Sequence, residues 1–504
     1  MNQVKTGAAL NYVIIGLNTL TGLLYTPFML RCLGQNEYGL YSLVASVITY
    51  LTLLDFGFGS AIVRYTAKIR ATGTRGEEWS LYGMFLSAYA IIGLLVTIGG
   101  IILFLNTDRM FDRSMSPAEL AQARIMMALM VGNLAVTFPL SIFGSIISAY
   151  ERFVFQRCLS ISRILISTVV LIAVLSMGYK AIAMVIVQTV FSIGTLLANL
   201  LYCKYRLRIK IYFHSFNIAL LKEIMVFSFW NFLGAIIDRI YWSTGQFILG
   251  IYSGTVAVAV FSLAITLMNL YMSMSTSFNS VLLPRITVMA TQKDKNREIS
   301  DLFIKTGRLQ FCVLALILSG FIVFGRQFIQ LWAGDGYSAT YTIALIFFSI
   351  LTCPLIQNVG LTILLARGQV KFRSLTYLGI AIASLAAQIV VTPHYGAIGC
   401  AMVIATALFI GQWVIMNIYY RQRQGIAIGQ FWLQITRMAI TPTLITFAAC
   451  LLLRFINISS WWDVGAAILV FLSVYLPCFY FFSMNQYERD NILIPLKAIA
   501  ARIR

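Results

Sequence analysis

Fourteen long apolar segments divide this chain of 504 residues. Most of them meet or exceed the roughly 20 residues that a helix needs to cross the hydrocarbon core of a bilayer. They are unbroken apolar runs, whereas the strands of a membrane barrel are short and alternate in polarity. Charged residues make up 11% of the sequence, compared with about 25% in soluble domains. The sequence therefore predicts an all-α polytopic membrane protein with about 14 transmembrane helices. They lie near residues 8–30, 38–62, 81–105, 122–149, 159–177, 181–203, 224–250, 255–284, 309–325, 339–365, 374–393, 396–419, 432–453 and 464–483.

The basic residues gather in alternate loops. Of the 37 Lys and Arg, 28 fall in one set of loops, seven fall in the other, and Arg163 and Arg239 lie inside apolar segments. By the positive-inside rule the larger set is cytoplasmic, and an even number of spans then places both termini in the cytoplasm. Loops that face anionic lipid headgroups account for the net charge of +20, so no nucleic-acid partner is needed to explain it.

Neither the loops nor the cysteines indicate an enzyme or a metal site. The loops are too short for a soluble catalytic domain, so we expect no catalytic residues. The eight Cys are spread over separate segments without a C-x-x-C pair, and His214 and His394 are far apart. This pattern predicts no disulfide framework, no metal ligands and no bound cofactor.

The stretch from Asn11 to Gly34 reappears without a gap at Asn231 to Gly254. The matched positions are Asn11 with Asn231, Asn18 with Asp238, Thr26 with Gln246, and Gly34 with Gly254. Chance similarity between helices rich in Leu and Ile is the alternative, and the coincidence of polar residues makes it the less favoured account. Because six spans separate the copies, equivalent helices run in the same direction, as in parallel repeats.

The repeat predicts the domain organisation. Spans 1–6 (residues 1–210) form an N-terminal six-helix lobe, and spans 7–12 (residues 211–425) form a C-terminal six-helix lobe, with a central cavity between them. Residues 426–504 contribute two additional helices, spans 13 and 14, and a cytoplasmic amphipathic tail.

Polar residues inside the spans are candidates for the cavity lining. Asp238 and Arg239 fall near mid-bilayer, where each charge costs about 2.5–3.5 kcal/mol on insertion scales. We therefore expect this pair to face a cavity or a partner helix. Two polar stripes follow from helical spacing, and they consist of Asn11, Asn18 and Tyr25 on span one and Asn231, Asp238 and Gln246 on span seven. Helix–helix contact is the favoured interpretation for the Asn residues, and function for the charged pair.

A second concentration of special residues lies in the inner third of span two, at Asp55, Gly57, Gly59 and Arg64. In a straight helix Asp55 and Arg64 would be about 13.5 Å apart, too far for an ion pair. A bend at the glycines would change that distance and expose backbone groups to a ligand. In the alternative interpretation, nearby Ser or Thr residues hold Asp55, and Arg64 anchors the inner interface.

These motifs resemble a known family. The pattern Leu33-Gly34-x-x-x-Tyr38-Gly39-x-Tyr41-Ser42, followed by Leu54-Asp55-x-Gly57-x-Gly59-x-Ala61-x-x-Arg64 and by Ala149-Tyr-Glu151-Arg152-Phe153, is similar to polysaccharide-biosynthesis flippases. These belong to the multidrug/oligosaccharidyl-lipid/polysaccharide exporter superfamily. The resemblance implies 12 or 14 spans in two lobes within the bacterial cytoplasmic (inner) membrane. It also implies ion-coupled alternating access that moves an undecaprenyl-diphosphate-linked oligosaccharide, as in O-antigen or exopolysaccharide assembly, from the cytoplasmic to the outer leaflet.

The candidate site residues follow from that substrate. Arg239, Arg64 and Arg285 are expected to meet the diphosphate, because a buried anion needs compensation. Sugar contacts are expected from Asn11, Asn18, Tyr25, Asn231 and Gln246. Asp238 or Asp55 would carry a coupling proton or Na⁺. The expected partners are the lipid-linked glycan, membrane lipids and other polysaccharide-assembly membrane proteins.

Three other functions remain open. A multidrug exporter of the same fold would use an acidic cavity, whereas acids and bases are nearly balanced here. Transport of lipid II or a teichoic precursor differs only in its substrate. A membrane-bound glycan polymerase or glycosyltransferase would need larger loops with catalytic clusters.

Overall fold

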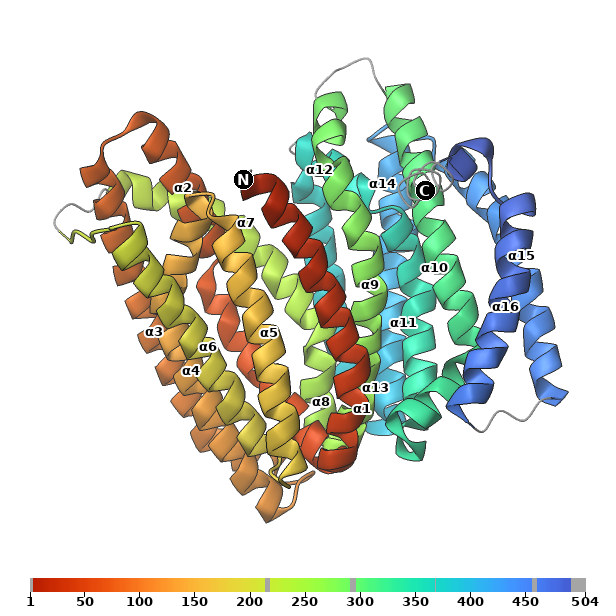
Figure 1. Cartoon of the computed structure of the whole chain (residues 1–504), viewed down its shortest axis with the longest axis horizontal. Helices are drawn as coiled ribbons and strands as arrows, with labels where there is room; N and C mark the ends of the chain where they lie inside the picture. Colours follow the sequence, from red (N-terminus) through yellow and green to blue (C-terminus); the bar gives the residue numbers. More distant parts are fainter. Residues whose placement is uncertain (1–2, 214–217, 291–295, 368, 456–459, 491–504) are drawn as a thin grey trace, which may run out of the picture. The chain divides into compact units, whose positions relative to one another are not determined.

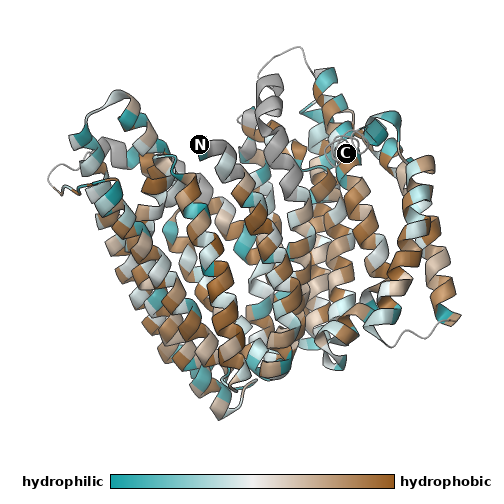
Figure 2. Cartoon of the chain, in the orientation of Figure 1, coloured by the Kyte–Doolittle hydropathy of each residue, from teal (hydrophilic) through white to brown (hydrophobic). Residues whose placement is uncertain are grey.

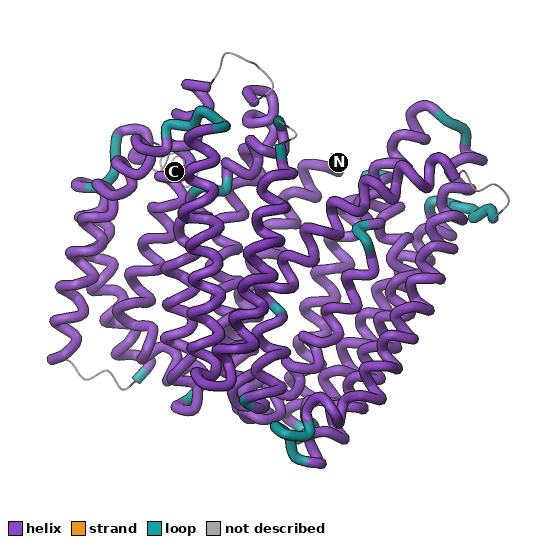
Figure 3. Tube along the Cα trace, turned by 180° about the vertical axis from the view of Figure 1, so that it is seen from behind, coloured by secondary structure: helices purple, strands orange, loops and turns teal. Residues whose placement is uncertain are grey.

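The computed structural model describes residues 3–213, 218–290, 296–367, 369–455 and 460–490. Within them the chain forms sixteen α-helices with short 3₁₀ or π segments. Figure 3 shows helices joined by loops and no strand in these residues. The all-α class predicted from the apolar runs is therefore confirmed.

Eleven helical stretches of the described residues are long and apolar enough to cross a membrane. Figure 2 shows apolar residues along the length of these helices. Two stretches, Ala9–Thr72 with 64 residues and Lys371–Gln422 with 52 residues, exceed the roughly 20 residues of one crossing. Non-helical backbone interrupts them at Gly34 and Gly396. The protein is thus multi-pass, and the count of about 14 spans stays a prediction.

The chain packs into two compact units. Unit 1 contains Met1–Ser262 and Leu385–Cys400, and unit 2 contains Leu263–Ser384 and Ala401–Arg504. These units follow the packing of the helices, whereas the lobe boundaries at residues 210 and 425 follow the sequence repeat and stay a prediction.

Unit 1 holds the first eight helices, which are labelled in Figure 1. They are α1 (Gln3–Leu51), α2 (Phe58–Thr72), α3 (Arg75–Phe111), α4 (Pro117–Ala149), α5 (Phe153–Ser176), α6 (Ala181–Leu201), α7 (Ile218–Trp242) and α8 (Thr244–Tyr252). A 3₁₀ turn, Thr52–Asp55, lies between α1 and α2, and a π segment, Tyr202–Arg206, follows α6. Two further helices are divided between the units, α9 (Gly254–Ala290) and α13 (Val370–Leu408).

Unit 2 holds the remaining helices. They are α10 (Asn296–Ala333), α11 (Ser338–Ile356), α12 (Val359–Ala366), α14 (Met416–Gln422), α15 (Ile428–Leu452) and α16 (Trp461–Phe482). The short segments Asp335–Tyr337, Phe409–Ile415 and Leu453–Phe455 complete it. A buried Arg308–Glu488 ion pair joins α10 to the segment after α16.

The sequence repeat is also a repeat in the backbone. Gly34 has a φ of 74° and its counterpart Gly254 has a φ of 78°. Side chains disfavour this left-handed region, so glycine is the residue that ends one helical stretch and starts the next at both places. The two glycines that the sequence repeat pairs therefore have the same backbone conformation, each at a turn between helices.

Local sequence signals start the helices that enclose the core of unit 1. Thr74 with Glu77 forms a capping box before α3, and Ser116 with Glu119 forms one before α4. Each box satisfies two backbone amides that a helix start would otherwise leave unpaired. The two helices then run side by side (Figure 1) and bury an aromatic core with α2.

Candidate functional site

The second apolar span is broken inside unit 1. The 3₁₀ turn Thr52–Asp55 ends at Phe56, which has a φ of 49°, and Gly57 has a φ of 72° before α2 starts at Phe58. A left-handed non-glycine residue such as Phe56 is strained and persists only when its surroundings hold it. The weakening expected at Gly57 is thus a complete break, while Gly59 lies within the first turn of α2.

Asp55 lies at this break and is held by a tyrosine. The Tyr89 hydroxyl on α3 donates a 2.8 Å hydrogen bond to Asp55 Oδ1, and the Gly57 backbone amide also donates to the carboxylate. Tyr89 is buried among aromatic rings, with Phe58 at 5.7 Å and Phe138 at 6.3 Å between centroids. Among the described residues Asp55 is therefore held by Tyr89 and the Gly57 amide, and not by a nearby Ser or Thr as in the alternative interpretation of the sequence.

Helix α7, from the second copy of the repeat, packs against the break. The rings of Phe56 and Phe232 lie 4.6 Å apart. Tyr50, near the end of α1, is joined to Thr244 at the start of α8 by a hydrogen bond between their hydroxyl groups. Thr244 Oγ1 in turn lies 3.3 Å from the Arg239 carbonyl, to which it donates.

The two charges predicted on α7 differ in exposure. Arg239 is half-buried, and its positive charge acts on the Tyr50 hydroxyl, whereas Asp238 is exposed. One region of unit 1 thus contains the Asp55 carboxylate at the break and the Arg239 guanidinium beside Tyr50.

The C-terminal end of α2 is anchored by aromatic and acidic groups. The Arg70 guanidinium stacks 3.9 Å from the Tyr150 ring centroid and donates to the Ala149 carbonyl at 3.1 Å. Buried Glu78 accepts hydrogen bonds from the hydroxyls of Tyr82 at 2.6 Å and Tyr150 at 2.7 Å. Burial, and then the bond to Glu78, raise the pKa of Tyr150 to about 12. The helix between the break and this anchor carries Arg64.

Arg64 is exposed on α2. Its guanidinium lies 5.7 Å from the Tyr65 ring centroid. One turn further, Lys68 lies 4.0 Å from Glu223 of α7 in an exposed pair. Such a surface pair stabilises a protein by about 0–1 kcal/mol, so α2 is held mainly by its buried aromatic face.

The predicted sugar contacts are dispersed along three helices. Asn11 is half-buried and Asn18 is exposed on α1, while Gln246 is half-buried on α8. The Tyr25 hydroxyl is buried and has no hydrogen-bond partner among the described residues. The side chains of Asn231 and Arg285 lie outside the described part of the structure.

Three residues of this site were not predicted from the sequence. Tyr50, Tyr89 and Thr244 lie in apolar surroundings without a spacing pattern that marks them. Only the contacts of Tyr89 with Asp55 and of Tyr50 with Thr244 distinguish them from ordinary membrane-helix residues.

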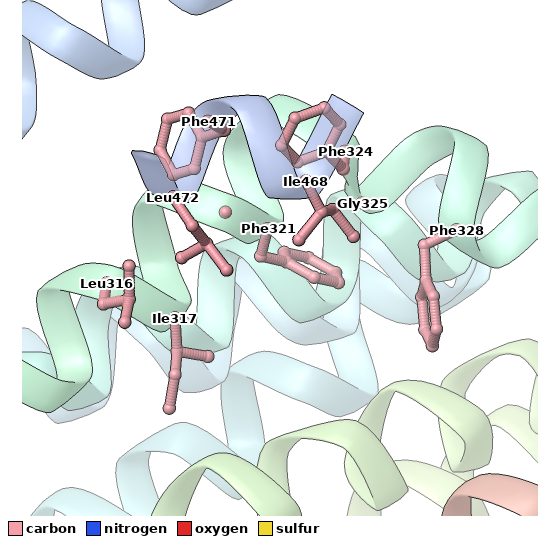
Figure 4. Close-up of a pocket in the computed structure, with 10 residues that line it drawn as sticks. Leu316, Ile317, Phe321, Phe324, Gly325, Phe328, Ile468, Phe471 and Leu472 are labelled. Carbon is pink, nitrogen blue, oxygen red and sulfur yellow. The ribbon is translucent and has the colours of Figure 1, made fainter. Parts of the chain in front are cut away.

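Pockets in the two units differ in chemistry. In unit 1 a cavity of about 200 Å³ is lined by Tyr41, Asn133 and Gln188 among others, and the Tyr41 hydroxyl donates to Gln188 at 2.9 Å. In unit 2 a pocket of about 300 Å³ between α10 and α16 is lined by apolar residues such as Phe321 and Phe471 (Figure 4). This pocket has no group for an anion or a sugar. A second unit 2 pocket of about 500 Å³, lined by α10, α15 and α16, has the carboxylate of Asp463 among apolar residues and no cation for an anionic headgroup. The candidate site is therefore assigned to unit 1.

Comparisons with known proteins agree with this architecture. A family described as "Polysaccharide biosynthesis protein" matches residues 4–290. The fold resembles "Lipid II flippase MurJ, inward closed conformation" with a TM-score of 0.69 and 16% identity, over 94% of this chain and 97% of the other. It also resembles the "Inward-facing conformation of a multidrug resistance MATE family transporter of the MOP superfamily", with a TM-score of 0.59 and 15% identity, over 83% and 95% of the two chains. At these identities the likeness shows a shared fold.

A curated relative matches a shorter region. "Uncharacterized membrane protein EpsK" from Bacillus subtilis (strain 168) is 24% identical over 122 residues. The match covers 24% of this chain and 23% of that protein, so it spans less than a quarter of either.

Proposed function

The chain belongs to the polysaccharide biosynthesis protein family, and from this premise we propose that it is a flippase for lipid-linked oligosaccharides. Its substrate is an oligosaccharide repeat unit on undecaprenyl diphosphate, which it moves from the cytoplasmic to the outer leaflet. The observation that carries the proposal is the broken second span of unit 1, where Asp55 accepts a hydrogen bond from Tyr89 and where the charge of Arg239 acts on the nearby Tyr50 hydroxyl.

The chemistry of the substrate explains why those groups are needed. The polyprenyl tail stays in lipid, whereas the headgroup carries two negative charges and many hydroxyls. A charge taken out of water without a partner is costly, so the route requires cations. Arg239 and Arg64 supply them in unit 1, and Arg285 occupies the equivalent inner end of span eight. Polar side chains at Asn11, Asn18, Tyr25, Asn231 and Gln246 contact the sugars.

The break also suits ion coupling. Discontinuous membrane helices leave backbone groups available at depth, where transporters bind substrates and ions. Asp55 accepts hydrogen bonds at the break, so binding of a proton or Na⁺ to its carboxylate changes the contacts that hold Phe56 and Gly57. This links the charge of Asp55 to the position of α2. Asp238 on α7 is the second candidate for the coupling ion.

A multidrug exporter is the alternative function. The fold likeness to a multidrug transporter is compatible with it, and exposed Asp238 is suited to an organic cation. The balance of acids and bases around the break favours an anionic headgroup instead. A glycan polymerase or glycosyltransferase is disfavoured because the fold likenesses are to a lipid flippase and a multidrug transporter.

The test measures surface glycan in a host strain whose own flippase gene is deleted. We expect the wild-type chain to restore the glycan, and Arg239→Ala to abolish it while membrane abundance stays unchanged. Arg113→Ala, in an exposed outer turn, is the matched control and should retain transport. Full glycan in the Arg239→Ala strain would refute the role of this residue. Drug resistance without glycan display by the wild-type chain would favour the alternative.

A further inference from the structure

Arg163 is a second arginine inside an apolar segment, and the proposed site does not use it. It lies on α5, which has 24 residues and is therefore about 36 Å long. Arg163 is ten residues from the first residue, Phe153, so it lies about 15 Å along the helix. In a hydrocarbon core of about 30 Å this is close to the middle, where a charged side chain facing acyl chains is strongly disfavoured.

The face of α5 that carries Arg163 is not its apolar exposed face. At 100° per residue, the centre of the apolar exposed arc lies about 130° around the helix from Arg163. That arc consists of Leu165, Ile166, Val169 and Ile172. Arg163 instead shares a stripe about 60° wide with Gln156, Ser160 and Ser167. A lipid-facing arc and a polar stripe therefore occupy different sides of the same helix.

Gln156, at the start of the polar stripe, contacts a neighbouring helix, whereas Arg163 makes no such polar contact in the part of the chain that the structure describes. Gln156 Nε2 donates to the Gly144 carbonyl on α4 at 2.6 Å, while Ser160 Oγ donates within α5 to the Gln156 carbonyl at 2.9 Å. Arg163 is exposed and has neither an ion pair nor a hydrogen bond within the described ranges. Its guanidinium is thus available at a depth where water or a polar ligand has to surround it.

Helix α1 places amides at the same depth. Helices α1 and α5 lie side by side (Figure 1), and the Val154 amide donates to Gln3 Oε1 at 3.4 Å near their starts. Asn11 is eight residues beyond Gln3, or about 12 Å, and Arg163 is nine beyond Val154, or about 13.5 Å. A cation and an amide therefore share one level of unit 1.

We infer that Arg163 is a mid-membrane binding residue for the phosphate-bearing headgroup of the transported lipid. This rests on the proposed function, because it adds a contact to the same transport route. Arg163 holds the phosphate by charge-assisted hydrogen bonds, between the cytoplasmic entry and the outer release of the headgroup. The headgroup phosphate of an ordinary phospholipid offers similar chemistry, so the test has to separate the two sources.

The first experiment measures whether the Arg163 face is wet. Arg163→Cys and Val169→Cys are introduced separately in a chain whose exposed Cys32 and Cys158 are changed to Ser. A membrane-impermeant thiol reagent is applied to inverted vesicles and to spheroplasts. We expect labelling at position 163 from at least one side and protection at position 169. Equal protection at both positions would overturn the inference, because Arg163 would then face lipid.

The second experiment measures binding of farnesyl diphosphate to the purified protein in phosphatidylcholine nanodiscs. Loss of one charge-assisted contact predicts a Kd about 10- to 100-fold weaker for Arg163→Gln. Arg163→Lys should keep most of the affinity, and Arg113→Gln should keep all of it. An unchanged Kd in correctly folded Arg163→Gln would refute the role of Arg163 while the flippase proposal stands.

The remaining outcomes separate the possible ligands. If phosphatidylglycerol displaces the probe as well as farnesyl diphosphate does, Arg163 binds any lipid phosphate and the substrate assignment is wrong. If the wild-type protein neither binds the probe nor restores surface glycan, the proposed function fails together with this inference. If the wild-type protein restores surface glycan and the Kd of the Arg163→Gln variant for farnesyl diphosphate is unchanged, only the inference about Arg163 is overturned.

Discussion

The buried ion pair between Arg308 and Glu488 permits a quantitative stability prediction for unit 2. Arg308 on α10 is 7% exposed and Glu488 is 0% exposed. Arg308 Nη2 lies 2.9 Å from Glu488 Oε2 and 3.2 Å from the Ser483 carbonyl, and the Asn485 amide donates to the same carboxylate oxygen at 2.8 Å. The pair thus fastens the segment after α16 to α10.

Glu488→Gln removes the negative charge and leaves Arg308 buried without a counterion. Breaking one partner of a buried pair costs about 3–5 kcal/mol. Domains of 150–250 residues, the size range of unit 2, lose about 2–4 °C in Tm per kcal/mol. We therefore expect the apparent Tm of the purified protein to fall by roughly 6–20 °C. The Tm is measured during heating from tryptophan fluorescence or from a fluorescent thiol-reactive dye that labels cysteines as they become exposed.

Two further variants show whether the pair itself is responsible. Asp108→Asn disrupts the exposed pair with Arg124 and should lower the Tm by less than about 4 °C, because surface pairs contribute about 0–1 kcal/mol. The double variant Arg308→Met with Glu488→Met removes both charges and should recover more than half of the loss. A Glu488→Gln protein that melts within about 2 °C of wild type, or a double variant no more stable than the single one, would refute the reasoning.

Other predictions concern the break and a close helix contact. Gly57→Ala places a side chain at a φ of 72° and should destabilise unit 1 by about 1–2 kcal/mol, whereas Gly16→Ala, with open space around it, should be neutral or slightly stabilising in the same melting assay. Tyr89→Phe removes the donor to Asp55, a contact of about 1.5–3 kcal/mol, and should lower both Tm and glycan export; unchanged export would separate this contact from transport. Gly39→Ala would place a methyl group 1.9 Å from a backbone carbonyl and should cost about 1–3 kcal/mol or more, and a normal Tm would contradict the close approach.

Much of the architecture was predictable because it follows from local sequence. Apolar runs of about 20 residues can satisfy their backbone inside a membrane only as helices, so the class did not depend on distant contacts. Gly34 and Gly254 were paired from the repeat, and both are turns with positive φ. Gly57 was expected to weaken span two because glycine is a poor helix former, and the helix breaks there.

The sequence by itself determined that the chain forms long apolar helices, where the repeat begins and where the second span is weak, because these properties depend on neighbours along the chain. Only the tertiary structure decided partners between distant residues. Tyr89 holds Asp55, and Arg308, which the sequence placed among the cytoplasmic loop charges, is buried against Glu488, 180 residues away. The local sequence around a charged or hydroxyl side chain does not show which residue it will pair with, because burial and pairing arise when helices that are far apart in sequence pack together.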